Sequence, residues 1–323
     1  MRRRTALALL AGAIINSTHG PAQSSNQPAR IGYLSAQRNE RLYQAFLRGL
    51  RHHGYVDGSG FLMLDRSAGG RPELLDQAAV ELVGLKPDVI LAVGSGATRA
   101  AQRATKTTPI IFAPVGDAIR LRFVQQPERP EGNMTGISLD NWVLNQKRLE
   151  ALKDYFPYVK RVAVLANFGN PAGPGQVEIT QKGAEKLGLE VTVTIIFNKD
   201  DLDRALAEIA AQKPDAVHVI TDAMLDVSRD RIIAFMVAQR LLSIHDHRAF
   251  TEEGGLVSYG PNLDKLSEQA GWYVDRVLKG TPISDLPVDQ PSTLELIVNL
   301  KAARAIGIEI PPFLLAAANE VIE

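Results

Sequence analysis

The chain has 323 residues, with 36 basic and 36 acidic side chains, 45% hydrophobic residues and no cysteine. This composition is typical of a folded globular chain and excludes a disordered or collagen-like one. A net charge of zero without basic clusters argues against nucleic acid as a partner, and the lack of cysteine excludes disulfides, thiolate metal sites and cysteine nucleophiles. The length accommodates two domains.

The N-terminus has the order of a secretory signal. Three arginines at positions 2–4 precede an apolar run at 6–15 and a small, polar stretch at 16–27. The alternative is a first helix of the domain, but such a helix would be expected to have a polar face. The apolar run is also shorter than the roughly 20 residues that span a bilayer. We therefore predict a signal peptide over 1–29 and a mature chain in the periplasm.

From residue 30 onward, short β-branched runs alternate with longer amphipathic stretches, which predicts parallel sheets covered by helices on both faces. The first series comprises strands at 31–34, 61–65, 88–93, 109–112 and 134–137, and helices at 40–53, 72–84 and 97–105. The second comprises helices at 140–156, 176–187, 201–212 and 225–240, and strands at 161–166, 189–197, 216–221 and 242–245. A helix at 263–279, an extended stretch at 286–299 and tail helices follow.

Two such series indicate an α/β fold with two Rossmann-like, doubly wound lobes. No Gly/Ser linker separates them, so we expect short hinge crossings at 136–139 and near 258–261. The first lobe is predicted at 30–137 plus about 261–285, and the second at 138–260 plus about 286–323. Two rigid lobes on thin hinges are able to close over a ligand.

In open parallel sheets, ligands bind beyond the carboxyl ends of the strands, where loops and helix N-termini meet. Two aromatic residues near strand ends, Phe168 and Tyr259, are suited to stack on a ligand ring. Together these rules select Ser35, Ser95, Gly96, Ala97, Val115, Gly116, Asp117, Asn167, Phe168, Asn170, Asp222 and Tyr259 as candidate ligand contacts.

The segment Gly94-Ser-Gly-Ala-Thr98 is the most specific candidate, because its glycines let a ligand approach the backbone before a helix expected from Ala97. It suits a carboxylate or a phosphate, although Ser95 is equally suited to cap its own helix. Asp117 and Asp222 are able to accept a hydrogen bond from a ligand ammonium, or to cap a helix or turn.

An enzyme is the competing interpretation, because the same segment is similar to a dinucleotide-binding fingerprint with Asp117 about 20 residues later. Arg99 stands where the third glycine belongs, and two βα units precede the motif. His245-Asp-His247 lacks a recognisable third metal ligand and is interpreted as a polar strand end. We expect no catalytic residues, no metal and no cofactor.

The chain also carries a series of short motifs in a defined order from about residue 30 to its end. They are Glu73-Leu-Leu, Ala78-Ala-Val-Glu-Leu-Val83, Lys86-Pro-Asp-Val-Ile90, Pro109-Ile-Ile-Phe112, Val115-Gly-Asp117, Gly132-Asn-Met-Thr-Gly-Ile137, Arg161-Val-Ala-Val-Leu165, Gly254-Gly-Leu-Val-Ser-Tyr-Gly260, Leu286-Pro-Val288 and Leu296-Ile-Val-Asn-Leu300. In these motifs the sequence resembles the ABC transporter substrate-binding proteins of the tryptophan-binding-like group.

The resemblance implies a type I periplasmic binding fold with a small ligand enclosed between the lobes. It adds Ser138, at the first hinge, to the candidate contacts. It also implies a monomer that delivers a carboxylated solute, an amino acid or an aromatic acid, to an ABC permease of the inner membrane. A ligand-sensing domain that partners a receptor uses the same cleft and stays open as an alternative, with a dinucleotide-dependent enzyme less favoured. The sequence departs from the group at Asn141-Trp-Val and at His245-Asp-His, which leaves the ligand undetermined.

Overall fold

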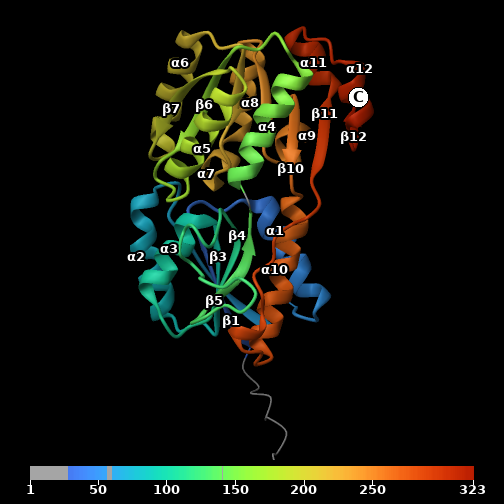
Figure 1. The fold of residues 1–323 in the computed structure, drawn as a ribbon. Coiled ribbons are helices and arrows are strands. Elements are labelled where there is room, and N and C mark those ends of the chain that lie inside the picture. The colour runs from blue at the N-terminus through green and yellow to red at the C-terminus, as the bar shows by residue number, and fades with distance from the viewer. Residues whose placement is uncertain (1–27, 57–59, 140) are drawn as a thin grey trace, which may run out of the picture.

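The computed structural model describes residues 28–56, 60–139 and 141–323, so nearly all of the predicted signal peptide lies outside the described residues. Two α/β lobes are stacked one above the other (Figure 1). This confirms the predicted fold class. Among the helices described, none is long and apolar enough to cross a membrane.

The first lobe contains β1 (Ala29–Ser35), α1 (Glu40–His52), β2 (Phe61–Ser67), the one-turn helix η1 (Pro72–Leu74), α2 (Leu75–Gly84), β3 (Val89–Val93), α3 (Gly94–Ala104), β4 (Ile110–Val115), β5 (Met134–Ser138), α10 (Leu263–Leu278) and the one-turn helix η3 (Ile283–Asp285). Its five parallel strands lie in the order β2-β1-β3-β4-β5. As predicted from its apolar sequence, β3 is central. Helices α2 and α3 lie on one face of the sheet and α1 and α10 on the other (Figure 1). The buried side chains of each pair form a separate core with that face.

The second lobe contains α4 (Asn141–Tyr155), β6 (Arg161–Asn167), α5 (Gly173–Lys186), β7 (Glu190–Ile196), η2 (Lys199–Asp201), α6 (Leu202–Gln212), β8 (Ala216–Val219), α7 (Ala223–Val227), α8 (Arg229–Ala238), β9 (Leu242–His245), α9 (Arg248–Glu252), β10 (Val257–Gly260), β11 (Glu295–Asn299), α11 (Leu300–Ile306), α12 (Pro312–Ala317) and β12 (Glu320–Ile322). Its strands lie in the order β12-β11-β10-β9-β8-β6-β7, and only the β10–β11 pair is antiparallel. Side chains of α4 and α5 pack on one face, and those of α6 and α8 on the other.

Three crossings join the lobes within the described chain: one from β5 to α4, one from β10 to α10, and one that enters β11. In the last of these, Asp289 pairs with the edge of β5, since its N–H donates to Gly136 O at 3.0 Å and its carbonyl accepts from Ser138 N at 2.9 Å. The segment up to residue 289 therefore lies with the first lobe, which differs from the boundary near 286 expected from sequence. The expected boundary followed a proline-flanked stretch, whereas the pairing depends on a strand edge far away in the sequence.

The helix expected at 225–240 is two helices, α7 and α8, separated by Ser228. The N–H of Ser228 donates to the carbonyls of Met224 and Leu225, and its hydroxyl donates to Met224 O at 3.0 Å. This local capping ends α7, because serine side chains compete with the helical backbone for hydrogen bonds. As a result, the short helix α7 starts directly at the carboxyl edge of the sheet, where Asp222 caps it.

The helix pair α1 and α10 fixes the position of the start of α1. Gly49 and Gly271 face each other, and a Cβ at Gly271 would lie only 2.5 Å from the carbonyl carbon of Gly49. The two backbones therefore touch, which no larger residue permits. Asn39 caps α1 by accepting a hydrogen bond from Leu42 N at 3.2 Å. This packing holds the start of α1 at the interface between the lobes.

Candidate functional site

A cavity of about 60 Å³ lies between the lobes, beyond the carboxyl ends of the parallel strands, where ligands bind in open α/β sheets. The first lobe supplies most of its apolar wall through Leu42, Val93, Pro114, Val115, Leu139 and Leu263. The second lobe supplies most of its polar wall through Asn170, Gln176, Thr221, Asp222, Asp226, Asp246 and His247. The two walls therefore differ in chemistry.

On the first-lobe side, the start of α3 reaches the cavity at Gly94 and Ser95. The helix begins at Gly94, which has a φ of +82°, and not at Ala97 as expected from sequence. Val93 is the N-cap and provides no side-chain hydrogen bond, while the Ser95 hydroxyl accepts from Gly116 N at 3.0 Å. Ser95 thus does not cap its helix, and the first-turn N–H groups lack a side-chain partner. Together with the helix dipole they favour a bound anion.

On the second-lobe side, Asp222 is the N-cap of α7. Its Oδ1 accepts from the N–H groups of Met224 and Leu225 at 2.9 and 3.0 Å. The side-chain amides of Asn167 and Asn170 donate to its two oxygens at 3.1 and 2.8 Å. Burial raises the pKa of this carboxyl despite those bonds. Asp222 therefore shapes the wall and organises the β6 loop, with most of its acceptor capacity in use.

Asp226 and His247 form a buried ion pair at the cavity wall, with 2.8 Å between Asp226 Oδ1 and His247 Nε2. Burial opposes a charge on the imidazole, but the carboxylates of Asp246 and Asp226 outweigh it and raise the pKa of His247 to about 9. Burial is the largest single influence on Asp226 and opposes its charge, but His247, Arg229 and the hydrogen bond from Asn39 together outweigh burial and lower the pKa of this carboxyl. Both groups are consequently charged at neutral pH.

Asp246 also lines the cavity, and its Oδ1 lies 3.6 Å from His247 Nε2. That distance is beyond a hydrogen bond. Within the described chain the Asp246 carboxylate therefore keeps acceptor capacity, unlike those of Asp222 and Asp226. No lysine or arginine is among the described residues that line the cavity. The second-lobe wall thus carries more negative than positive charge.

The interior behind Asp246 contains a fully buried arginine, Arg148 of α4. Its guanidinium donates to Asn145 Oδ1 at 2.7 Å, to Tyr259 O at 2.8 Å and to Asp246 O at 3.4 Å. Burial lowers its pKa to about 10. Asn145 in turn donates to the side-chain oxygen of Gln176, which lines the cavity, at 3.1 Å. This network fixes the backbone of the Asp246 loop.

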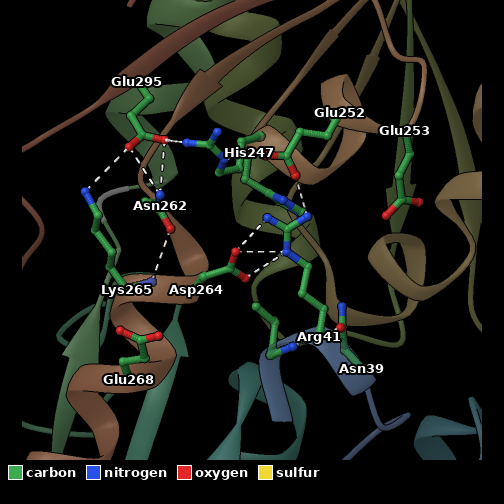
Figure 2. Close-up of polar contacts among 12 residues, drawn as sticks. Asn39, Arg41, His247, Glu252, Glu253, Asn262, Asp264, Lys265, Glu268 and Glu295 are labelled. Atoms are coloured by element: carbon green, nitrogen blue, oxygen red, sulfur yellow. Dashed lines mark hydrogen bonds and ion pairs between the residues drawn. The ribbon is translucent and has the colours of Figure 1, made fainter. Parts of the chain in front are cut away.

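Several polar contacts join the lobes at the rim of the cavity (Figure 2). The side-chain amide of Asn39, from the first lobe, donates to Asp226 Oδ2 of the second. Arg41 donates to Glu252 of α9 at 2.5 Å and to both oxygens of Asp264 at 2.6 to 2.9 Å (Figure 2). The contacts of Asn39 with Asp226 and of Arg41 with Glu252 join the lobes, whereas Asp264 belongs to α10 of the first lobe and orients the Arg41 guanidinium.

Comparison with known proteins identifies the family. The family model described as ABC transporter substrate binding protein matches residues 32–322. The chain belongs to this family. The resemblance deduced from the short motifs is thereby confirmed.

Individual members of the ABC transporter substrate-binding family are similar over most of the chain. A tyrosine-binding protein of Clostridioides difficile is 26% identical over 270 residues, which cover 84% of this chain and 77% of the relative. The structure of an ABC domain from Streptococcus pneumonia in complex with L-Trp is 27% identical and has a TM-score of 0.82, with 92% of this chain and 100% of that one covered. A conserved domain protein from Vibrio cholerae is 26% identical with a TM-score of 0.84, over 91% and 100% of the two chains.

The structure brings some of the sequence-predicted site residues together. Ser95, Val115, Gly116, Asn170 and Asp222 line the cavity. Gly96, Ala97 and Asn167 line a narrower space of about 20 Å³, which shares Ser95, Asn170 and Asp222 with the cavity. The strand-end rule thus located this region correctly, although ligand contact by these residues stays a prediction.

Other predicted residues lie outside the lining of the cavity. Phe168 is in an outer groove, and the Asp117 carboxylate accepts from the N–H groups of residues 119 and 120. Ser138 accepts from Ala118 N at 3.0 Å, Ser35 is buried at the end of β1, and Tyr259 borders a separate surface groove. For Asp117, the structure shows the turn-forming role that the sequence left open.

Sequence reasoning missed Asn39, Gln176, Thr221 and Asp226 as lining residues, and it left Gln37, Asp246 and His247, which follow predicted strands, out of the final set of ligand contacts. Asp246 and His247 directly follow β9, so the strand-end rule was the signal that pointed to them. For Asn39 and Asp226 there was no such signal, since Asn39 is the N-cap of α1 and Asp226 lies within α7. In the part of the chain that the structure describes, no group of three or more His, Asp or Glu side chains is arranged to hold a metal ion, and both His245 and His247 pack against Phe250.

Proposed function

We propose that this protein is the periplasmic solute-binding component of an ABC importer and that it binds a small amino acid between its lobes. The observation that carries this proposal is the polarity of the cavity, with a helix N-terminus on one wall and an incompletely paired carboxylate on the other. A zwitterion matches both walls at once. The family membership and the amino acids named for two relatives support the same class.

In this proposal the ligand carboxylate lies at the start of α3, where the first-turn N–H groups donate to it and the helix dipole stabilises its charge. The ligand ammonium lies against Asp246. Each charge-assisted hydrogen bond contributes roughly 1.5 to 3 kcal/mol, so the loss of one weakens binding about tenfold to a hundredfold. Binding is non-covalent and requires no cofactor.

Because the two charged groups of the ligand contact different lobes, only the closed arrangement satisfies both. A ligand shifts an open-closed equilibrium by its difference in affinity for the two states. The cross-lobe contacts of Asn39 and Arg41 at the rim further stabilise the closed state. A permease in the inner membrane then receives the closed, loaded form, after export directed by the N-terminal signal.

Thermal-shift measurements test this function with three kinds of compound: an L-amino acid, its amide and the corresponding acid without the amine. An amino acid at a hundred times its Kd adds about 2.7 kcal/mol of stability, which raises Tm measurably. We expect the amide and the deaminated acid to lose most of the shift. If deaminated acids stabilise the protein as well as amino acids do, the zwitterion site is wrong.

A matched pair of variants assigns the ammonium contact. Asp246→Asn removes the proposed acceptor charge inside the cavity, while Asp203→Asn removes an exposed carboxylate on α6 that pairs with Arg231. Asp246→Asn should weaken amino-acid binding about tenfold to a hundredfold, and Asp203→Asn should leave it unchanged. Equal affinities of the two variants would contradict the role of Asp246.

A further inference from the structure

We infer that the cavity selects amino acids with a compact aliphatic side chain and excludes aromatic ones. This inference rests on the proposed function and adds the class of substrate. It departs from the relatives, whose names refer to tyrosine and to L-Trp. Four features point to this selectivity: the cavity wall, its volume, the positions of the aromatic residues and the contacts at the rim.

The wall that faces the ligand side chain is aliphatic. Leu42 comes from α1, Val93 and Val115 from the ends of β3 and β4, Leu139 from the first crossing and Leu263 from the start of α10. Among the described residues that line the cavity there is no phenylalanine, tyrosine or tryptophan. Aromatic rings gain from offset or edge-to-face contacts with other rings, and this wall offers none to a ligand.

The volume of the cavity sets a second limit on the size of the ligand side chain. The cavity measures about 60 Å³. An apolar protein cavity of about 150 Å³ accommodates a single benzene molecule. Any amino acid therefore requires the cavity to widen, and a benzyl, phenol or indole side chain requires more widening than a short branched aliphatic chain does.

The aromatic side chains near the cavity are engaged elsewhere. Phe168 packs edge to face with Phe197, with 6.4 Å between ring centroids, in the outer groove. Trp142 packs so tightly on α5 that a Cβ at Gly175 would lie 1.9 Å from its ring, and the Arg120 guanidinium covers that ring at 5.1 Å. Neither Phe168 nor Trp142 lines this cavity, and Tyr259, the other stacking residue expected from sequence, borders a separate surface groove.

The contacts at the rim oppose enlargement of the cavity. Both Asn39 and Asp226 line it, and the bond between them joins the lobes. The contact of Arg41 with Glu252 of the second lobe lies beside it (Figure 2). Space for a larger side chain requires the lobes to separate here, which breaks these bonds. Binding of an aromatic amino acid therefore opposes closure of the lobes.

Isothermal titration calorimetry on the purified protein, after removal of co-purifying solutes by dialysis, tests this inference. The probes are L-leucine, L-isoleucine and L-valine against L-phenylalanine, L-tyrosine and L-tryptophan. We expect at least one aliphatic amino acid to bind at least tenfold more tightly than every aromatic one. An aromatic amino acid that binds as tightly as the best aliphatic one overturns this inference and leaves the proposed function standing. If no amino acid binds, both are overturned.

A variant with a wider cavity provides a second test. Leu42→Ala removes a partly buried side chain from the cavity, and Leu62→Ala removes an exposed leucine from β2 as a matched control. The affinity for L-phenylalanine relative to L-leucine should rise at least tenfold in Leu42→Ala and stay unchanged in Leu62→Ala. An unchanged ratio in a folded Leu42→Ala protein contradicts the inference, and the ligand panel on the unmodified protein decides it if that variant does not fold.

Discussion

Replacing His247 by glutamine should remove a pH-dependent part of the stability. His247 is buried between the carboxylates of Asp226 and Asp246, with Arg229 as the opposing cation, and its pKa is raised from 6.5 to about 9. A folded-state pKa above the unfolded one means that the imidazolium stabilises the fold fully below about pH 6.5 and that this contribution is lost as the pH rises through about 9. A difference of one in pKa corresponds to about 1.4 kcal/mol, so the contribution amounts to about 3 kcal/mol.

Urea unfolding at several pH values between 6 and 10 measures this effect. The free energy of unfolding of the unmodified protein should exceed that of His247→Gln by the largest margin near pH 6, and the margin should shrink by about 3 kcal/mol toward pH 10. His52→Gln, at an exposed position near the end of α1, is the control and should show no such trend. A margin that stays constant from pH 6 to 10 would refute the charged pair.

Two further substitutions test how the cavity is held together. Asn39→Ala deletes the cross-lobe bond to Asp226 and should weaken amino-acid binding by about tenfold in calorimetry while the far-UV circular dichroism stays unchanged. Gly136→Ala should prevent folding of the first lobe, because a Cβ there would lie 2.0 Å from Phe112 O and φ is +148°. Gly132→Ala, where the Cβ meets open space, should cost far less stability; equal soluble yields and melting temperatures of the two glycine variants would contradict this reasoning.

The alternation of strand and helix patterns was enough to predict both lobes. The central position of β3 followed from its apolar residues, since a strand covered on both faces by helices requires them. The strand-end rule then placed Ser95, Asn170 and Asp222 at the correct edge of their sheets. These predictions succeeded because strand and helix periodicities are local properties of the chain, and the topology of parallel sheets directs the loops to one edge.

The short motifs determined the family for a similar reason, because their order along the chain is visible without coordinates. The break between α7 and α8 was missed, although its cause is local, because a single serine does not interrupt a helical pattern visibly. The start of α3 at Gly94 was missed because its N-cap, Val93, has no capping side chain that would mark the helix start in the sequence.

Only the tertiary structure decided which polar groups are paired and which remain free for a ligand. Asn39 meets Asp226 across 187 positions of sequence, and His247 acquires its charge from two carboxylates that burial brings beside it. The same packing keeps Phe168 and Tyr259 out of the lining of the cavity, whose large apolar side chains are aliphatic. Desolvation and contact distance govern these properties, and both depend on how the lobes pack, which no pattern along a single strand or helix contains.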